Sequence, residues 1–148
     1  PRIFWISCKS ERFISMTATS PKLSADVPFV INKANVEPRD TGYGERVYEL
    51  AGSTDGNIHK HCIAIVDIDP GKSSKNHYHP SVEETYFVLS GQGLINIDGN
   101  EAALSQGDLV TIPTGAHHKV TNRSETDILQ LYVTCAEPWT PECSVFLE

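Results

Sequence analysis

The chain has 148 residues and a formal net charge of −7, with 39% hydrophobic and 21% charged residues. This length fits one domain that can bury a core of its own. The acidic balance argues against a nucleic-acid partner, because a phosphate backbone is bound by a basic face. No apolar run in the sequence reaches the length of a membrane-spanning helix. The composition is ordinary for a soluble globular protein.

The first 44 residues are expected to form an N-terminal extended arm with turns, packed on the following domain or on a partner. Prolines and glycines recur between Pro28 and Gly44, and no helical period is sustained. The short β-prone run at residues 3–6 is expected to add a strand to a sheet edge. The single methionine is Met16, so residues 1–15 are interpreted as an extension upstream of a natural start.

Short apolar segments separated by glycine or proline turns follow from residue 45 onwards. Strands are expected at residues 47–50, 61–68, 94–97, 100–104, 109–112 and 127–134. The strongest single signal is the hairpin around Asp98-Gly99, because this pair supplies the two positive-φ positions of a type I′ turn. Residues 137–148 are expected to form a C-terminal tail. The pattern predicts an all-β sandwich or barrel.

The four cysteines, Cys8, Cys62, Cys135 and Cys143, show no C-x-x-C spacing and no dense disulfide framework. Cys62 falls in an apolar strand and is interpreted as a small buried hydrophobe. A bond between Cys135 and Cys143 stays open, but the spacing favours reduced thiols and hence a cytoplasmic protein.

Two histidines and a glutamate fall within eight residues of one another in a strand-rich region. His77 and His79 are two apart, so on a strand their side chains leave the same face. Glu84 stands among apolar strand residues, where a carboxylate is costly to bury unless it is paired or bound to a metal. We therefore predict that these three side chains form the greater part of a metal site.

Two segments resemble the paired signature of the cupin superfamily. The first pattern, G-x5-H-x-H-x4-E-x6-G, is matched at every spacing by Gly71, His77, His79, Glu84 and Gly91. The second, G-x5-P-x-G-x2-H-x3-N, is matched by Gly107, Pro113, Gly115, His118 and Asn122. The resemblance covers about residues 45–135 well.

This resemblance implies a double-stranded β-helix, or jelly-roll, barrel over residues 45–136. It also implies that His77, His79, Glu84 and His118 bind a metal. Three imidazoles and one carboxylate suit a divalent transition metal such as Fe, Mn, Ni, Co, Cu or Zn. The neighbours Glu83 and His117 are expected to lie at the surface, because one strand cannot direct adjacent side chains at the same point.

For a cupin of this kind we expect a metal-dependent enzyme that acts on a small oxygenated molecule, such as an organic acid, a polyol or a sugar derivative. Oxygenation, isomerisation, decarboxylation and lyase chemistry all stay open. Tyr86, His61 and Tyr132 are the candidate acid–base groups. The pair His59 and His61 is otherwise interpreted as a strand end at the barrel rim. The alternative is a non-catalytic module that binds a metabolite or sugar. The open sheet edges and the apolar arm suggest a homodimer.

Overall fold

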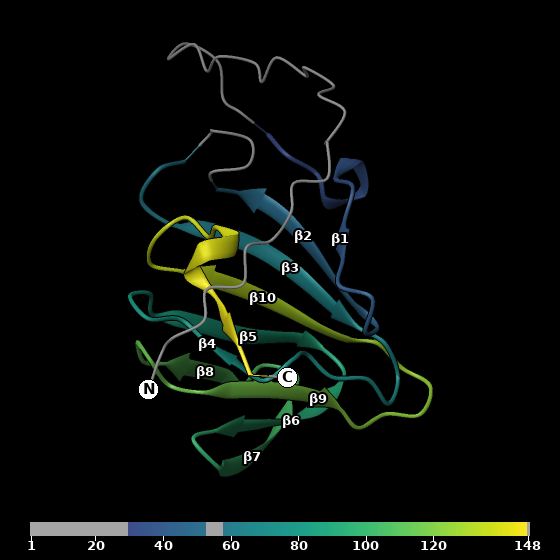
Figure 1. Ribbon diagram of the computed structural model, residues 1–148. Coiled ribbons are helices and arrows are strands. Elements are labelled where there is room, and N and C mark those ends of the chain that lie inside the picture. Colours follow the sequence, from purple (N-terminus) through teal and green to yellow (C-terminus); the bar gives the residue numbers. More distant parts are fainter. Residues whose placement is uncertain (1–29, 53–57, 148) are drawn as a thin grey trace.

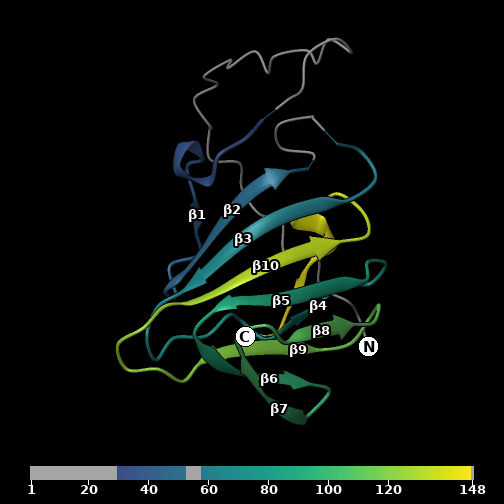
Figure 2. The ribbon, with the colours of Figure 1, turned by 180° about the vertical axis from the view of Figure 1, so that it is seen from behind.

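Two antiparallel sheets make up the protein, which we describe from a computed structural model covering residues 30–52 and 58–147 (Figure 1). The six-stranded sheet has the order β1 (Arg39–Asp40), β2 (Glu45–Ala51), β3 (Cys62–Ile68), β10 (Leu129–Cys135), β5 (Glu84–Ser90) and β8 (Leu109–Ile112). The five-stranded sheet has the order β11 (Val145–Phe146), β4 (His77–Tyr78), β9 (His118–Asn122), β6 (Gln92–Ile97) and β7 (Asn100–Ser105). Seen from behind, β10, from late in the chain, lies between β3 and β5 in the large sheet (Figure 2).

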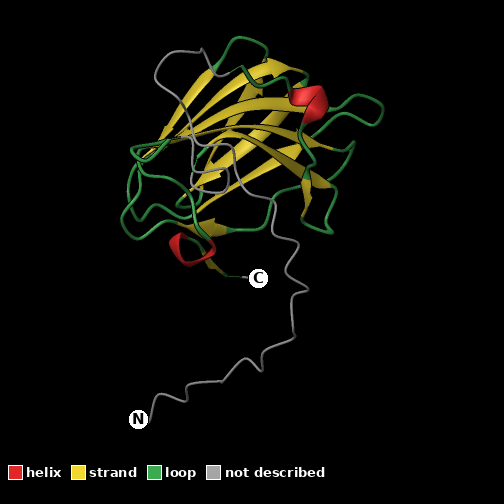
Figure 3. Cartoon of the chain, turned by 90° about the horizontal axis from the view of Figure 1, so that it is seen from above, coloured by secondary structure: helices red, strands yellow, loops and turns green. Residues whose placement is uncertain are grey.

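The strand order is that of a double-stranded β-helix, so the expectation of an all-β jelly-roll barrel is confirmed. The view from above shows the strands in facing layers with only short helical turns outside them (Figure 3). These turns are two 3-10 helices, η1 (Lys33–Asn35) and η2 (Pro141–Cys143). No helix among the described residues is long and apolar enough to cross a membrane.

Alternating side chains give the strands their inner and outer faces. Along β10, buried residues at every second position alternate with partly exposed ones. The inward set contributes to one core that both sheets share. Its buried members are Val66, Ile68, Tyr86, Val88, Ile95, Leu104, Ile112, Ala116, Val120, Leu129, Leu131 and Val133. Apolar side chains therefore fill part of the space between the sheets, and the polar groups described below lie beside this core.

The hairpin between β6 and β7 forms where the sequence predicts it. Asp98 and Gly99 have φ angles of 49° and 83°, as a type I′ turn requires. Asp98 is the one non-glycine residue with positive φ in the described part of the chain. Its carboxylate accepts a hydrogen bond from the backbone N–H of His117, which ties this turn to the start of β9.

Both ends of the described chain join the sheets. Within the predicted arm, β1 pairs with β2 and so extends the large sheet, and Lys33 forms an ion pair with Asp67 at 2.6 Å. The expected tail is more ordered than predicted, because β11 pairs with β4 and extends the small sheet. The predicted edge strand at residues 3–6 and the start at Met16 lie outside the described residues.

Candidate metal centre

Four side chains from three separate strand segments meet at one point between the sheets. His77 begins β4, and His79 follows this short strand by one residue. Glu84 is the first residue of β5, and His118 is the first of β9. One ligand atom from each of the four lies within 4.8 Å of the others. His77 and His118 are direct partners in the β4–β9 pairing, which explains how residues so far apart in sequence meet.

Backbone carbonyl groups select the tautomer of all three histidines. The Nδ1 atoms of His77, His79 and His118 each lie 2.9 Å from a carbonyl oxygen, those of Lys75, Cys143 and Ala116 respectively. Because a carbonyl oxygen only accepts, each Nδ1 must donate a proton. This leaves Nε2 of each ring available as a metal ligand. Hydrogen bonds of this kind orient metal-binding histidines in many proteins.

The Glu84 carboxylate is the negative group of the cluster. Its Oε2 lies 3.1 Å from His118 Nε2 and 3.4 Å from His79 Nε2. Burial opposes ionisation, but the hydrogen bond with His118 and the nearby His79 ring outweigh it and hold the pKa of Glu84 well below its usual range. Glu84 is therefore a buried carboxylate that carries its charge at neutral pH.

The imidazoles at this site differ in their affinity for protons. Burial, with the adjacent His118, lowers the pKa of His77 to about 4, so this ring is neutral at pH 7. Burial also opposes the protonation of His79, but Glu84 outweighs it and raises the pKa of that ring. Before a metal binds, His79 is therefore the ring that holds a proton more tightly, whereas His77 is neutral.

The donor set fits a divalent transition metal. Three Nε2 atoms and one carboxylate oxygen are hard-to-borderline donors of the type that Fe, Mn, Co, Ni, Cu and Zn accept. His79 Nε2 is buried without a hydrogen-bond partner, and it is the one such side-chain nitrogen or oxygen in the part of the chain described here. A metal bound among this nitrogen, the carboxylate and the two further imidazoles would satisfy it.

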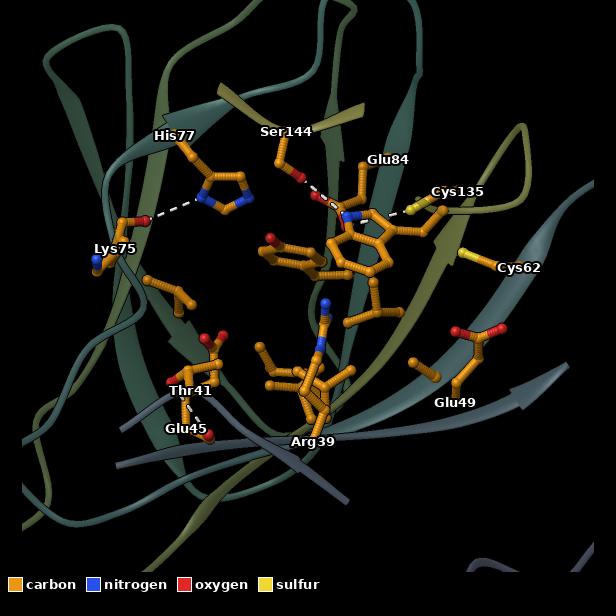
Figure 4. A pocket seen from close by; sticks show the side chains of 18 of the residues that line it. Arg39, Thr41, Glu45, Glu49, Cys62, Lys75, His77, Glu84, Cys135 and Ser144 are labelled. Atoms are coloured by element: carbon orange, nitrogen blue, oxygen red, sulfur yellow. Dashed lines mark hydrogen bonds between the residues drawn. The ribbon is translucent and has the colours of Figure 1, made fainter. Parts of the chain in front are cut away.

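A cavity of about 300 Å³ opens beside the ligand cluster and is lined by His77, His79 and Glu84 (Figure 4). One wall is apolar and comes from core residues such as Val66, Val120 and Leu131. Further lining residues come from β1 and β2, and the Arg39 side chain extends from β1 into the cavity (Figure 4). The volume and the mixture of apolar and polar walls suit a small molecule.

Aromatic rings hold two cations at this cavity. The Arg39 guanidinium lies 3.7 Å from the centre of a Trp139 ring, and Lys75 Nζ lies 4.3 Å from the centre of the Tyr43 ring. Glu45 also lines the cavity, and burial raises the pKa of its carboxyl. Sequence reasoning missed Arg39, Glu45 and Trp139, because they belong to the predicted arm, the first barrel strand and the tail, where no motif marks them.

Of the three candidate acid–base residues, the structure brings only Tyr86 to the cavity. Tyr86 is buried, and its ring centre lies 6.1 Å from that of His118. Burial and the Glu84 carboxylate raise the pKa of Tyr86, so its hydroxyl stays protonated and can donate.

The other two candidates, His61 and Tyr132, line a separate hollow together with Glu83 and Thr134. Tyr132 stands between Leu131 and Val133 on β10, and both of these neighbours line the central cavity. Strand alternation therefore turns Tyr132 outward, and it turns His61 away from the inward Cys62 in the same way. Neither residue is among those that line the central cavity, so their role as acid–base groups stays a prediction.

The neighbours of the ligands lie at the surface, as strand alternation predicts. Glu83 is exposed, and so is His117, whose ring stacks on Tyr78 with centres 4.9 Å apart. His59 is also exposed. Cys62, Cys135 and Cys143 are free thiols, so the disulfide left open for Cys135 and Cys143 does not form.

The family model described as "Cupin domain" matches residues 64–135, a range that contains all four predicted ligands. This chain contains a cupin domain. The match agrees with the resemblance of the two motifs and with the barrel and the ligand cluster.

Relatives of this cupin include proteins with and without a described activity. An uncharacterized protein of Methanocaldococcus jannaschii is 26% identical over 113 residues, which are 76% of this chain and 90% of that protein. An acireductone dioxygenase of Bacillus thuringiensis is 31% identical over 74 residues, 45% of this chain and 42% of the enzyme. The cupin therefore spans less than half the length of this enzyme.

Among solved structures, the oxalate decarboxylase of Lactobacillus farciminis, in a complex with formate, has a similar fold. It superimposes with a TM-score of 0.71 at 21% identity, over 82% of this cupin and 36% of the decarboxylase chain. At this identity the likeness shows a shared fold and does not identify a substrate.

Proposed function

We propose that this cupin is a metal-dependent enzyme that acts on a small oxygenated metabolite. The observation that carries the proposal is the convergence of three imidazole nitrogens and one carboxylate at a cavity of about 300 Å³. A bound divalent metal supplies Lewis acidity, or redox chemistry if it is iron, to oxygen atoms of a substrate. An enzymatic role is supported by a dioxygenase among the sequence relatives and by a decarboxylase among the structures of similar fold.

The chain itself supplies groups that bind and orient such a molecule. Arg39 and Lys75 offer donors to oxygen atoms at the cavity wall, and the Trp139 ring offers a flat apolar surface. Tyr86 presents a protonated hydroxyl beside the metal ligands. Glu45, whose pKa is raised, is a further carboxyl group in the cavity and can exchange a proton with a bound substrate.

A non-catalytic role is the rival proposal, since the same cavity could bind a metabolite without converting it. The catalytic and the non-catalytic role are distinguished by incubating purified protein with a panel of organic acids, polyols and sugar derivatives. Each is tested with an added divalent metal and with a chelator, and the products are followed by mass spectrometry. Conversion that the chelator abolishes supports the enzyme, and saturable binding without conversion supports the module.

The metal site is tested first, by substitution of one ligand. His77→Ala removes one of the three imidazoles, and we expect metal affinity to fall by more than about 100-fold, because even indirect partners of ligands contribute 10- to 100-fold. Elemental analysis of the purified protein should show about one equivalent of metal before the substitution and little after it.

The matched control is His117→Ala, which removes an exposed imidazole next to a ligand and outside the cluster. This variant should retain its metal. Equal metal content in both variants would show that the cluster does not bind the ion.

A further inference from the structure

Two cysteines that are not metal ligands lie in one row with Glu84 across three neighbouring strands. Glu84 on β5 is the direct partner of Cys135 on β10, and Cys135 is the direct partner of Cys62 on β3. Residues directly opposite one another in antiparallel strands project from the same face of the sheet. The carboxylate and the two thiols therefore face the interior side by side.

The hydrogen bond between Cys135 and Glu84 connects this row to the metal centre. Cys135 donates its S–H to Glu84 Oε1 at 3.4 Å, while Glu84 Oε2 faces the histidines. Figure 4 shows the Cys135 sulfur beside Glu84 and the Cys62 sulfur facing it from the neighbouring strand. The thiol thus touches the carboxylate oxygen that the imidazoles leave free.

Both thiols are buried and yet border the cavity. Cys62 and Cys135 are 4% and 3% exposed, and both line the cavity that holds the ligands. A small oxidant that enters the cavity can therefore reach them, although bulk solvent does not. Cα atoms of directly opposed residues are about 4.5–5.5 Å apart, inside the range of about 4.4–6.8 Å for disulfides. A bond between the two sulfurs requires no change of register.

We propose that Cys62 and Cys135 are a modification site at which hydrogen peroxide forms a cross-strand disulfide, and that this disulfide weakens metal binding at the adjacent site. The predicted effect on metal binding rests on the metal-binding function proposed above. The two thiols react with one small two-electron oxidant, hydrogen peroxide, and with no other reactant.

The reaction balances with one peroxide for each pair of thiols. The sulfur of one cysteine attacks a peroxide oxygen, the O–O bond breaks, and a sulfenic acid and one water form. The second sulfur displaces the sulfenic oxygen, which leaves as another water, and the S–S bond forms. Two thiols are oxidised by two electrons in total, and one peroxide is reduced to two waters.

The effect on the metal centre follows from the loss of the Cys135 S–H proton. A disulfide has no S–H, so Glu84 Oε1 loses the donor that orients it, and the sulfur is drawn toward Cys62. Loss of such an indirect partner lowers metal affinity by about 10- to 100-fold, and a thiol is a weak donor. We therefore expect a decrease of about tenfold.

The test treats the full chain with hydrogen peroxide and then measures two quantities. Peptide mapping by mass spectrometry identifies which cysteines are bonded, and competition with a chromophoric chelator gives the affinity for Zn²⁺. We expect a bond between Cys62 and Cys135 and a Zn²⁺ affinity about tenfold weaker. Reduction with a phosphine should restore the two free thiols and the original Zn²⁺ affinity.

Three variants separate the parts of the proposal. Cys62→Ser keeps the Cys135 thiol and blocks the bond, so its Zn²⁺ affinity should equal that of the reduced protein before and after peroxide. Cys135→Ala removes the donor without a disulfide and should bind Zn²⁺ about tenfold more weakly without oxidation. Cys143→Ser keeps the pair and should respond to peroxide like the parent protein.

Several results would overturn the proposal. Free thiols at Cys62 and Cys135 after treatment, their conversion to sulfinic acids, or bonds to Cys8 or Cys143 would reject the modification site. A Cys62–Cys135 bond with unchanged Zn²⁺ affinity would reject the effect on the metal centre. If the reduced protein binds no Zn²⁺, the proposed function fails, whereas the mapping still decides whether the disulfide forms.

Discussion

Protonation distinguishes two of the histidines of the metal site, although each ring directs Nε2 to the same place. His77 is neutral at pH 7, because its pKa is about 4. His79 binds its proton more tightly than an ordinary imidazole, because Glu84 outweighs the effect of burial. A metal that binds near pH 6, below the ordinary histidine value, must therefore displace a proton from His79 and does not displace one from His77.

This difference predicts the pH dependence of metal binding. The affinity of the metal-free protein for Zn²⁺ should rise by up to about tenfold per pH unit through the ordinary histidine value of 6.5, and level off above the raised pKa of His79. Calorimetry near pH 6 in buffers of different ionisation enthalpy should detect release of about one proton. A Zn²⁺ affinity that is constant between pH 5 and pH 8 would contradict this assignment.

At the scale of single elements, the turn between β5 and β6 shows why the first motif ends in glycine. Gly91 has a φ angle of +85°, which favours glycine. A Cβ atom at this position would lie 2.7 Å from the backbone oxygen of Ile128 and 3.0 Å from Leu129 Cα. Backbone atoms at the start of β10 cannot move aside easily, so two independent costs oppose any other residue here.

A pair of alanine substitutions separates these two costs. Gly99 has a similar φ angle of +83°, but nothing lies within 4 Å of its position for a Cβ. We expect Gly99→Ala to lower the free energy of unfolding by about 1 kcal/mol through backbone strain alone. Gly91→Ala should lower it by about 2–4 kcal/mol, since the collision adds to the strain.

Urea unfolding followed by circular dichroism measures both values. Equal losses of stability in the two variants would mean that the backbone around Ile128 relaxes to accept the methyl group.

The C-terminal segment also contributes to the metal site. The carbonyl of Cys143, at the end of η2, accepts the hydrogen bond from His79 Nδ1. The following strand, β11, pairs with β4, which carries His77. The segment expected to be a tail therefore helps to orient two of the four ligands.

At the scale of the whole molecule, the metal site joins the two sheets. Glu84 belongs to the six-stranded sheet, whereas His77 and His118 belong to the five-stranded sheet. A metal bound by all four residues therefore links both layers, and the unfolded chain cannot present this arrangement. Binding to the folded state alone stabilises a protein by mass action.

Removal of the metal should accordingly lower the thermal stability. When free metal exceeds the dissociation constant about 100-fold, the stabilisation is about 2.7 kcal/mol, or roughly 5–11 °C in Tm for a domain of this size. Differential scanning calorimetry with metal and with a chelator measures the shift. His117→Ala should show the full shift and His77→Ala almost none. An unchanged Tm for the parent protein would contradict a metal that links the sheets.

Sequence alone determined those features of this protein that depend on local spacing. The separation of His77 and His79, the spacing from Glu84 to Gly91, and the Asp98-Gly99 turn each describe a few consecutive residues whose geometry the backbone restricts. From these the main hairpin and the shared face of His77 and His79 could be predicted, as could the surface positions of Glu83 and His117. The jelly-roll barrel and the full set of four ligands were implied by the resemblance of the two motifs to the cupin signature.

The tertiary structure alone decided the features that depend on long-range pairing. Strand register places Cys62 beside Cys135, turns Tyr132 away from the cavity, and brings Arg39 from the expected arm against Trp139 from the expected tail. A shift of one residue in any of these pairings would reverse which side chains face inward. Such registers are set by contacts between residues far apart in the chain, and no short pattern in the sequence records them.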